Sequence, residues 1–140
     1  MSAEQNKGIA RRFAEEVINK NNLDAIDDLF APNYVSHVLP PGLPQGPEGE
    51  KLFASSFHAA FPDAHLTVED MIAEGDKVAT RFTYRATHKG EFMGIPPSGK
   101  QVTFTGIRIF RFDGGTIAEQ WGESDNLGFM QQLGVIPPMG

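Results

Sequence analysis

The chain has 140 residues, no cysteine and a formal net charge of -6 at pH 7. That length suits one domain with a real core, so we predict a single domain over residues 1–140. The twelve Lys and Arg residues form no basic run, which argues against a nucleic-acid partner. The sequence contains no apolar run of roughly 18 residues, as a membrane span needs, and no apolar signal-peptide core. We therefore expect a soluble, cytoplasmic protein with no nucleic-acid or membrane partner.

The first half of the chain has helical periodicity. Apolar residues recur every three to four positions over residues 2–18, and a second, short helix is expected at 22–30. An extended segment at 33–38 leads into a loop at 40–47 that is rich in proline and glycine. A third helix is expected at 48–61, where phenylalanines recur at helical spacing until a proline ends the pattern.

The second half of the chain changes to the period of β-strands. Strands are predicted at 65–72, 77–88 and 101–112. A fourth strand follows the hairpin turn at 113–115, and a short helix at 126–133 closes the chain. Helices followed by a run of antiparallel strands indicate an α+β fold, with the helices packed on one face of a curved sheet.

The strand at 101–112 has bulky residues on both faces. Phe104, Phe110 and Phe112 alternate with Ile107 and Ile109. Helices that cover one face would leave the isoleucines exposed. We therefore predict a homodimer formed through the outer face of the sheet.

The last strand carries the only tryptophan, Trp121, with Glu123 and Asp125 following at alternate positions. If the strand stays regular, all three side chains share one face. A carboxylate at the mouth of an apolar interior has a raised pKa and can act as a general acid or base. There are also simpler explanations: Asp125 can cap the helix that follows, Glu123 can leave the pocket at a bulge, and Trp121 can be an ordinary core residue.

Five further side chains are candidates for a site. His37 precedes the proline-rich loop, and His88 ends a strand where a glycine-rich loop begins. Arg81 and Arg108 lie within strands, where each must be solvated, contact a dimer partner or pair with a carboxylate. Tyr34 can donate a hydrogen bond to an enolate oxygen or simply pack in the core. The histidines lack metal-ligand spacing, so no metal is predicted.

Several segments, taken in order, resemble one family nearly end to end. They are residues 34–37 (Tyr-Val-Ser-His), 61–63 (Phe-Pro-Asp), 73–79, 87–100, 121–125 (Trp-Gly-Glu-Ser-Asp) and 132–134 (Gln-Leu-Gly). In this order and spacing the segments resemble the SnoaL-like polyketide cyclase family and its ester-cyclase-like branch. The resemblance implies the fold of the nuclear transport factor two and ketosteroid isomerase superfamily, a cone of helices and bent sheet around a cavity, and dimers formed through the sheet.

The resemblance also implies a reaction. Characterised members close a ring by intramolecular aldol condensation without metal or cofactor, and an aspartate that matches Asp125 acts as acid and base. We therefore expect cofactor-independent cyclisation or isomerisation of a small hydrophobic carbonyl compound. A non-catalytic binder and an epoxide hydrolase-like enzyme are the alternatives on the same fold. The expected catalytic residues are Asp125 and His37, and the expected substrate-binding residues are Trp121, Glu123, Tyr34, His88, Arg108 and Arg81.

Overall fold

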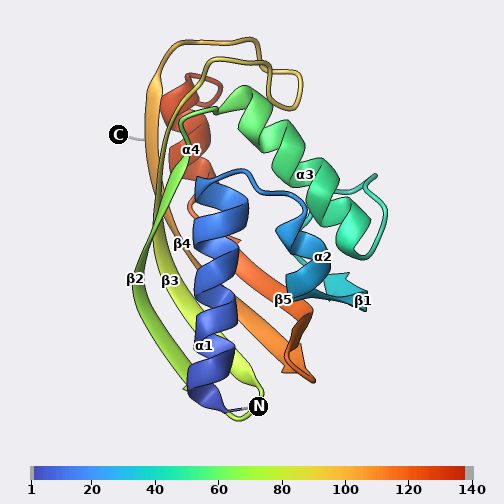
Figure 1. Ribbon diagram of the computed structural model, residues 1–140. Coiled ribbons are helices and arrows are strands. Elements are labelled where there is room, and N and C mark those ends of the chain that lie inside the picture. Colours follow the sequence, from blue (N-terminus) through green and yellow to red (C-terminus); the bar gives the residue numbers. More distant parts are fainter. Residues whose placement is uncertain (1, 138–140) are drawn as a thin grey trace.

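A computed structural model of the chain describes residues 2–137. The chain begins with three helical segments, turns into a strand and a further helix, and then forms four long strands and a closing helix (Figure 1). In chain order these are α1 (Ala3–Arg12), the π-helical stretch η1 (Phe13–Asn19), α2 (Ala25–Leu29), β1 (Phe30–Ser36), α3 (Pro47–Ala60), β2 (His65–Glu74), β3 (Lys77–Thr87), β4 (Gln101–Asp113), β5 (Thr116–Ser124) and α4 (Asn126–Leu133).

One five-stranded sheet organises the domain, with strand order β1-β5-β4-β3-β2. All neighbouring strands are antiparallel except β1 and β5, which are parallel. Figure 1 shows the strands strongly curved, with α1 packed against the sheet and α3 lying further from it. The predicted α+β architecture of helices on a curved, mostly antiparallel sheet is therefore confirmed.

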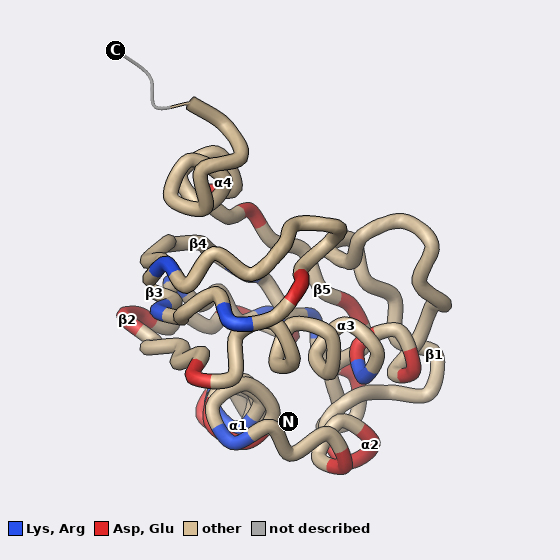
Figure 2. Tube along the Cα trace, turned by 90° about the horizontal axis from the view of Figure 1, so that it is seen from above, with Lys and Arg blue, Asp and Glu red and all other residues tan. Residues whose placement is uncertain are grey.

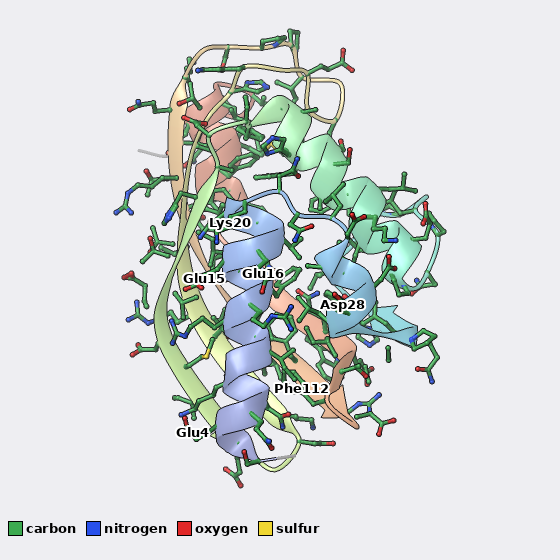
Figure 3. All side chains as sticks on the ribbon, viewed as in Figure 1. Glu4, Glu15, Glu16, Lys20, Asp28 and Phe112 are labelled. Carbon is green, nitrogen blue, oxygen red and sulfur yellow. The ribbon has the colours of Figure 1, made fainter. Side chains whose placement is uncertain are left out.

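The N-terminal helix begins with a capping box: the Ser2 hydroxyl accepts from the Gln5 N–H, and the Gln5 side chain accepts from the Ser2 N–H. Exposed charged residues continue beyond this helix: Glu4 is on α1, Glu15 is on η1 and Lys20 directly follows η1 (Figure 3). Seen from above, acidic and basic residues are interspersed along the trace, with acidic residues gathered on α2 (Figure 2). The charge pattern thus leaves an apolar side of this helix free to pack on the sheet.

The core lies between the helices and the inner face of the sheet, as two aromatic-rich clusters. One cluster joins the N-terminal helices to the β1 end of the sheet, and the other joins α3 and α4 to the middle strands. Their largest members are Phe13, Ile26, Phe30, Tyr34, Phe110 and Ile117 in the first, and Phe61, Phe82, Tyr84, Phe92, Phe104 and Phe129 in the second.

The outer face of the sheet exposes apolar residues, as the pattern of β4 predicts. Ile107 is 51% exposed and Ile109 is 39% exposed, whereas Phe104, Phe110 and Phe112 on the inner face are buried. The prediction that β4 carries bulky apolar residues on both faces is therefore confirmed, and the homodimer stays a prediction.

No helix among residues 2–137 is long and apolar enough to cross a membrane.

The last strand is not regular, because it contains a β-bulge. Phe112 pairs with Ile117 but Arg111 pairs with Glu119, so Ala118 is an extra residue on β5. The bulge shifts the alternation by one position, and Trp121 therefore lies opposite exposed Ile109 on the outer face. Trp121, which was expected to bind substrate, therefore points away from the interior and does not line the cavity.

Candidate active site

A cavity of about 600 Å3 lies between the helices and the inner face of the sheet. Apolar and aromatic side chains make most of its wall, and residues 37–41 lie at its rim. Its aromatic lining consists of Phe13, Phe53, Phe57, Tyr84, Phe92, Phe104 and Phe129. A cavity of this size and polarity is typical of a small-molecule site.

One carboxyl group is buried in the wall of this cavity. Glu50 lies on α3 three and seven residues before Phe53 and Phe57, so the helix turns all three toward the same side. Only 5% of Glu50 is exposed. Its Oε1 accepts from the Tyr34 hydroxyl at 2.5 Å and from Gln120 Nε2 at 3.1 Å. Gln120 Nε2 also donates to the Tyr34 hydroxyl oxygen at 2.7 Å, which closes a buried network of three side chains.

Burial raises the pKa of Glu50 above its ordinary value. The hydrogen bond from Tyr34, the positive charge of Arg108 and the hydrogen bond from Gln120 oppose that rise without cancelling it. Burial and the neighbouring Glu50 raise the pKa of Tyr34 as well, so its hydroxyl remains a neutral donor. The result is a carboxyl group that exchanges its proton nearer to neutral pH than a solvated glutamate.

The second charged group of the cavity is Arg108, on the inner face of β4. Its guanidinium carbon lies 4.8 Å from the ring centroid of Phe82 and 5.6 Å from that of Phe13. Burial raises the pKa of the nearby Tyr84 hydroxyl, and Arg108 opposes this rise. Glu50, Arg108 and two tyrosines therefore converge on the inner side of the sheet.

Within residues 2–137, no three His, Asp or Glu side chains come together as a metal site would require.

Of the predicted residues, Tyr34 and Arg108 meet at this network, whereas His37 and Trp121 pair outside it. The His37 and Trp121 rings stack 5.3 Å apart, and His37 Nε2 lies 2.6 Å from a carboxylate oxygen of Glu119. The hydrogen bonds from His37 and Arg111 hold the pKa of Glu119 below its usual range. His37 thus reaches the rim of the cavity, and Trp121 does not line it.

The structure does not place Asp125 in the cavity. Its carboxylate is exposed and accepts a hydrogen bond from the Gly128 N–H at 2.9 Å, as the N-cap of α4. The position expected for Asp125 is therefore wrong, because β5 ends at Ser124 and Asp125 already belongs to the helix start. Glu123 is exposed on the outer face and contributes only to the rim.

His88 and Arg81 also lie away from the cavity. His88 is 0% exposed, stacks on Phe61 at 5.2 Å and holds the following loop, because its Nδ1 accepts from the Ser98 N–H at 3.2 Å. Arg81 is exposed on the outer face and pairs with Asp70 at 2.7 Å. Neither residue lines the cavity, since one anchors a loop and the other faces solvent.

Sequence reasoning missed two members of the network, Glu50 and Gln120. The signal for Glu50 was present, because it is the one acidic residue on the stripe that carries Phe53, Ala54 and Phe57. No comparable signal marks Gln120, whose inward direction depends on the bulge in β5.

An α+β cone that encloses an apolar cavity with a few convergent polar groups defines a small-molecule enzyme or binder of the nuclear transport factor two-like class. The chain belongs to the SnoaL-like polyketide cyclase family, whose pattern matches residues 8–133. This membership confirms the predicted family and places the chain among enzymes of the cyclase type.

Individual relatives agree with the family match. Aklanonic acid methyl ester cyclase DnrD of Streptomyces peucetius is 25% identical over 128 residues, which cover 87% of this chain and 88% of that protein. The structure of TsrD from Streptomyces laurentii is 28% identical, with a TM-score of 0.89, and the match covers 97% of this chain and 99% of that one. IdmH from Streptomyces antibioticus is 37% identical, with a TM-score of 0.80, and covers 94% of this chain and 99% of its own.

Proposed function

We propose that the protein catalyses cofactor-independent proton transfer on a hydrophobic carbonyl compound, as the first step of an aldol-type cyclisation or isomerisation, and that Glu50 is its acid-base group. The observation that carries this proposal is the Glu50 carboxyl in the cavity wall. Its pKa is raised by burial, and two side chains fix its position. A general base is most effective when its pKa approaches the working pH.

The reaction proposed here needs only this group and the substrate. The Glu50 carboxylate takes a proton from a carbon flanked by carbonyl groups and leaves an enolate. In a cyclisation, the enolate carbon forms a bond to a second carbonyl carbon of the same molecule. The resulting alkoxide then takes the proton back from Glu50, which returns to its carboxylate form.

The alternatives have less support. A plain binder has no need for a buried carboxyl group, whose ionisation costs free energy without contributing to affinity for an apolar ligand. Epoxide opening would use an arginine and a second carboxylate beside Asp125. Arg108 instead lies near Glu50, and within the described part of the chain no further carboxylate belongs to this network. The cavity therefore favours carbonyl chemistry.

The test is deuterium exchange at the acidic carbon of ethyl benzoylacetate, an aryl β-keto ester, followed by NMR. Glu50→Gln should lower the protein-catalysed rate by about 10²–10⁴-fold. Glu48→Gln is the matched control, because Glu48 is an exposed acidic residue on the same helix, and it should leave the rate unchanged. Asp125→Asn tests the role that the family resemblance gives to Asp125. Full activity in Glu50→Gln together with loss in Asp125→Asn would refute the assignment to Glu50.

We further propose that the protein forms a homodimer through the outer face of the sheet. Support comes from exposed apolar residues on the outer face of the sheet: Ile107 and Ile109 on β4 and Ile72 on β2 are all accessible, and no helix of residues 2–137 covers them. The stacked Trp121 and His37 rings lie on this face as well. In this arrangement the cavities of both copies remain on the opposite side of the sheet.

A further inference from the structure

Arg108 lacks the ion pair that several other arginines of the chain form. Arg12, Arg81 and Arg111 each have a carboxylate oxygen within 3.0 Å, all near the surface. Arg108 lines the cavity, and no carboxylate oxygen among residues 2–137 comes within 4.0 Å of its guanidinium. A partly buried charge without a carboxylate partner is costly in a folded protein, so its presence needs a reason.

The surroundings hold this guanidinium in place. It lies over the Phe82 and Phe13 rings, which stabilise the cation but accept no directed hydrogen bond. Two glycines provide the space. A Cβ at Gly122 would lie 3.3 Å from Arg108 Cγ, and a Cβ at Gly106 would lie 2.5 Å from Phe82 Cζ. Both residues adjoin Arg108 or its supporting ring in the sheet register, so the side chain is positioned before any ligand enters.

The neighbouring Glu50 offsets this charge only when it is ionised. Its Oε1 is engaged by Tyr34 and Gln120, and burial favours its protonated form. The remaining ionisable residues of the lining are Tyr84, whose hydroxyl is neutral, and His37, His58 and Glu123, of which His37 and Glu123 are exposed. While Glu50 holds its proton, the inner part of the cavity therefore carries a positive charge that no carboxylate partner offsets, surrounded by aromatic rings.

We propose that Arg108 forms an anion subsite, and that the substrate of this cavity is an aromatic compound carrying a planar anion with two oxygens, either a carboxylate or the enolate of a 1,3-dicarbonyl group. A guanidinium presents two parallel N–H donors, which match two coplanar oxygens. The aromatic rings along the wall contact the body of the ligand. This inference rests on the proposed function in taking the same cavity as the substrate site, but it concerns binding and not proton transfer.

The test compares charged and neutral probes of the same shape by calorimetry at pH 7.5. The pairs are 2-naphthoate with methyl 2-naphthoate for the carboxylate, and 2-acetylindane-1,3-dione with its enol methyl ether for the enolate. The wild-type protein should bind at least one anion about ten- to a hundredfold more tightly than its neutral partner. The pair that shows this preference identifies which anion the subsite takes.

Arg108→Gln should abolish this preference, and Arg108→Lys should retain part of it, because lysine keeps the charge without the paired donors. Arg81→Gln, which alters an arginine on the outer face, is the matched control and should keep the full preference. If Arg108→Gln does not fold, Gly122→Ala replaces it, since the added methyl group displaces Arg108 and should weaken anion binding. Equal binding of anion and neutral probe by the wild type, or an unchanged preference without Arg108, would overturn the proposal.

The two proposals fail separately. An anion preference without any catalysed exchange of ethyl benzoylacetate would leave the subsite standing and remove the proposed reaction. Exchange that depends on Glu50, without a preference for the anion, would support the proposed reaction and remove the anion subsite.

Discussion

Glu50 links activity to stability, and the replacement Glu50→Gln should make the folded protein more stable at high pH. Glutamine has the shape of glutamate, and its carbonyl oxygen can still accept the hydrogen bond from Tyr34. It carries no charge, however, so the folded state no longer has to hold an ionised group that is 5% exposed. Removing this buried charge is expected to contribute about 1–3 kcal/mol to the free energy of unfolding at high pH.

The sign of the pH dependence follows from the raised pKa of Glu50. The folded protein keeps its proton at pH values where the unfolded chain has already released it. The stability that Glu50 gives is therefore fully present below the pKa of the unfolded chain and is lost as the pH rises through the folded pKa. Glu50→Gln removes this dependence, so the variant and the wild type should be closest in stability at about pH 4 and furthest apart at about pH 9.

The assay is urea unfolding of both proteins from pH 4 to pH 9, followed by circular dichroism, with Glu48→Gln as the exposed control. The difference in free energy of unfolding between Glu50→Gln and wild type should grow as the pH rises, and that for Glu48→Gln should stay small. A pH-independent difference, or a variant less stable than wild type at pH 9, would refute the account of Glu50 as a carboxyl group with a raised pKa.

Two further predictions concern Asp125 and the outer face of the sheet. Asp125→Ala should lower the free energy of unfolding by about 0.5–2 kcal/mol because it removes the N-cap of α4, whereas Asp125→Asn should change it little because asparagine also caps; equal urea midpoints for the two variants would contradict the capping role. In sedimentation experiments the wild type should behave as a dimer, and Ile107→Glu combined with Ile109→Glu should behave as a folded monomer. A wild type that is monomeric at all concentrations would rule out the proposed homodimer.

Much of the fold was predictable because local patterns agreed with the tertiary arrangement. The apolar spacing in α3, the alternation in β3 and β4, and the Gly134 cap after α4 each depend on neighbours a few residues apart. Several boundaries differed by a few residues. At one of them, residue 30 was expected to end the second helix, but Phe30 begins β1, where its pairing with Ile117 overrides the local helical pattern.

The candidate site was less predictable, because its members meet only through long-range pairing. The network joins three different elements through residues far apart in sequence. Tyr34 lies 16 positions before Glu50, and Gln120 lies 70 positions after Glu50 and 86 after Tyr34. The sequence could mark Glu50 as an acidic residue on an apolar stripe, but not its partners. The family resemblance drew attention to Asp125, which the structure places at a helix start instead.

The sequence by itself determined the type and order of most elements and the presence of bulky residues on both faces of β4, because these follow from periodicity along the chain. It also indicated the family, through the resemblance of its ordered motifs. The tertiary structure decided which face of β5 looks into the cavity. The extra residue Ala118 shifts the alternation of that strand by one position, which turns Gln120 inward and Trp121 outward. A one-residue bulge forms only in response to the partner strand, so the position of the final strand's side chains, and with it the make-up of the site, depended on the folded sheet.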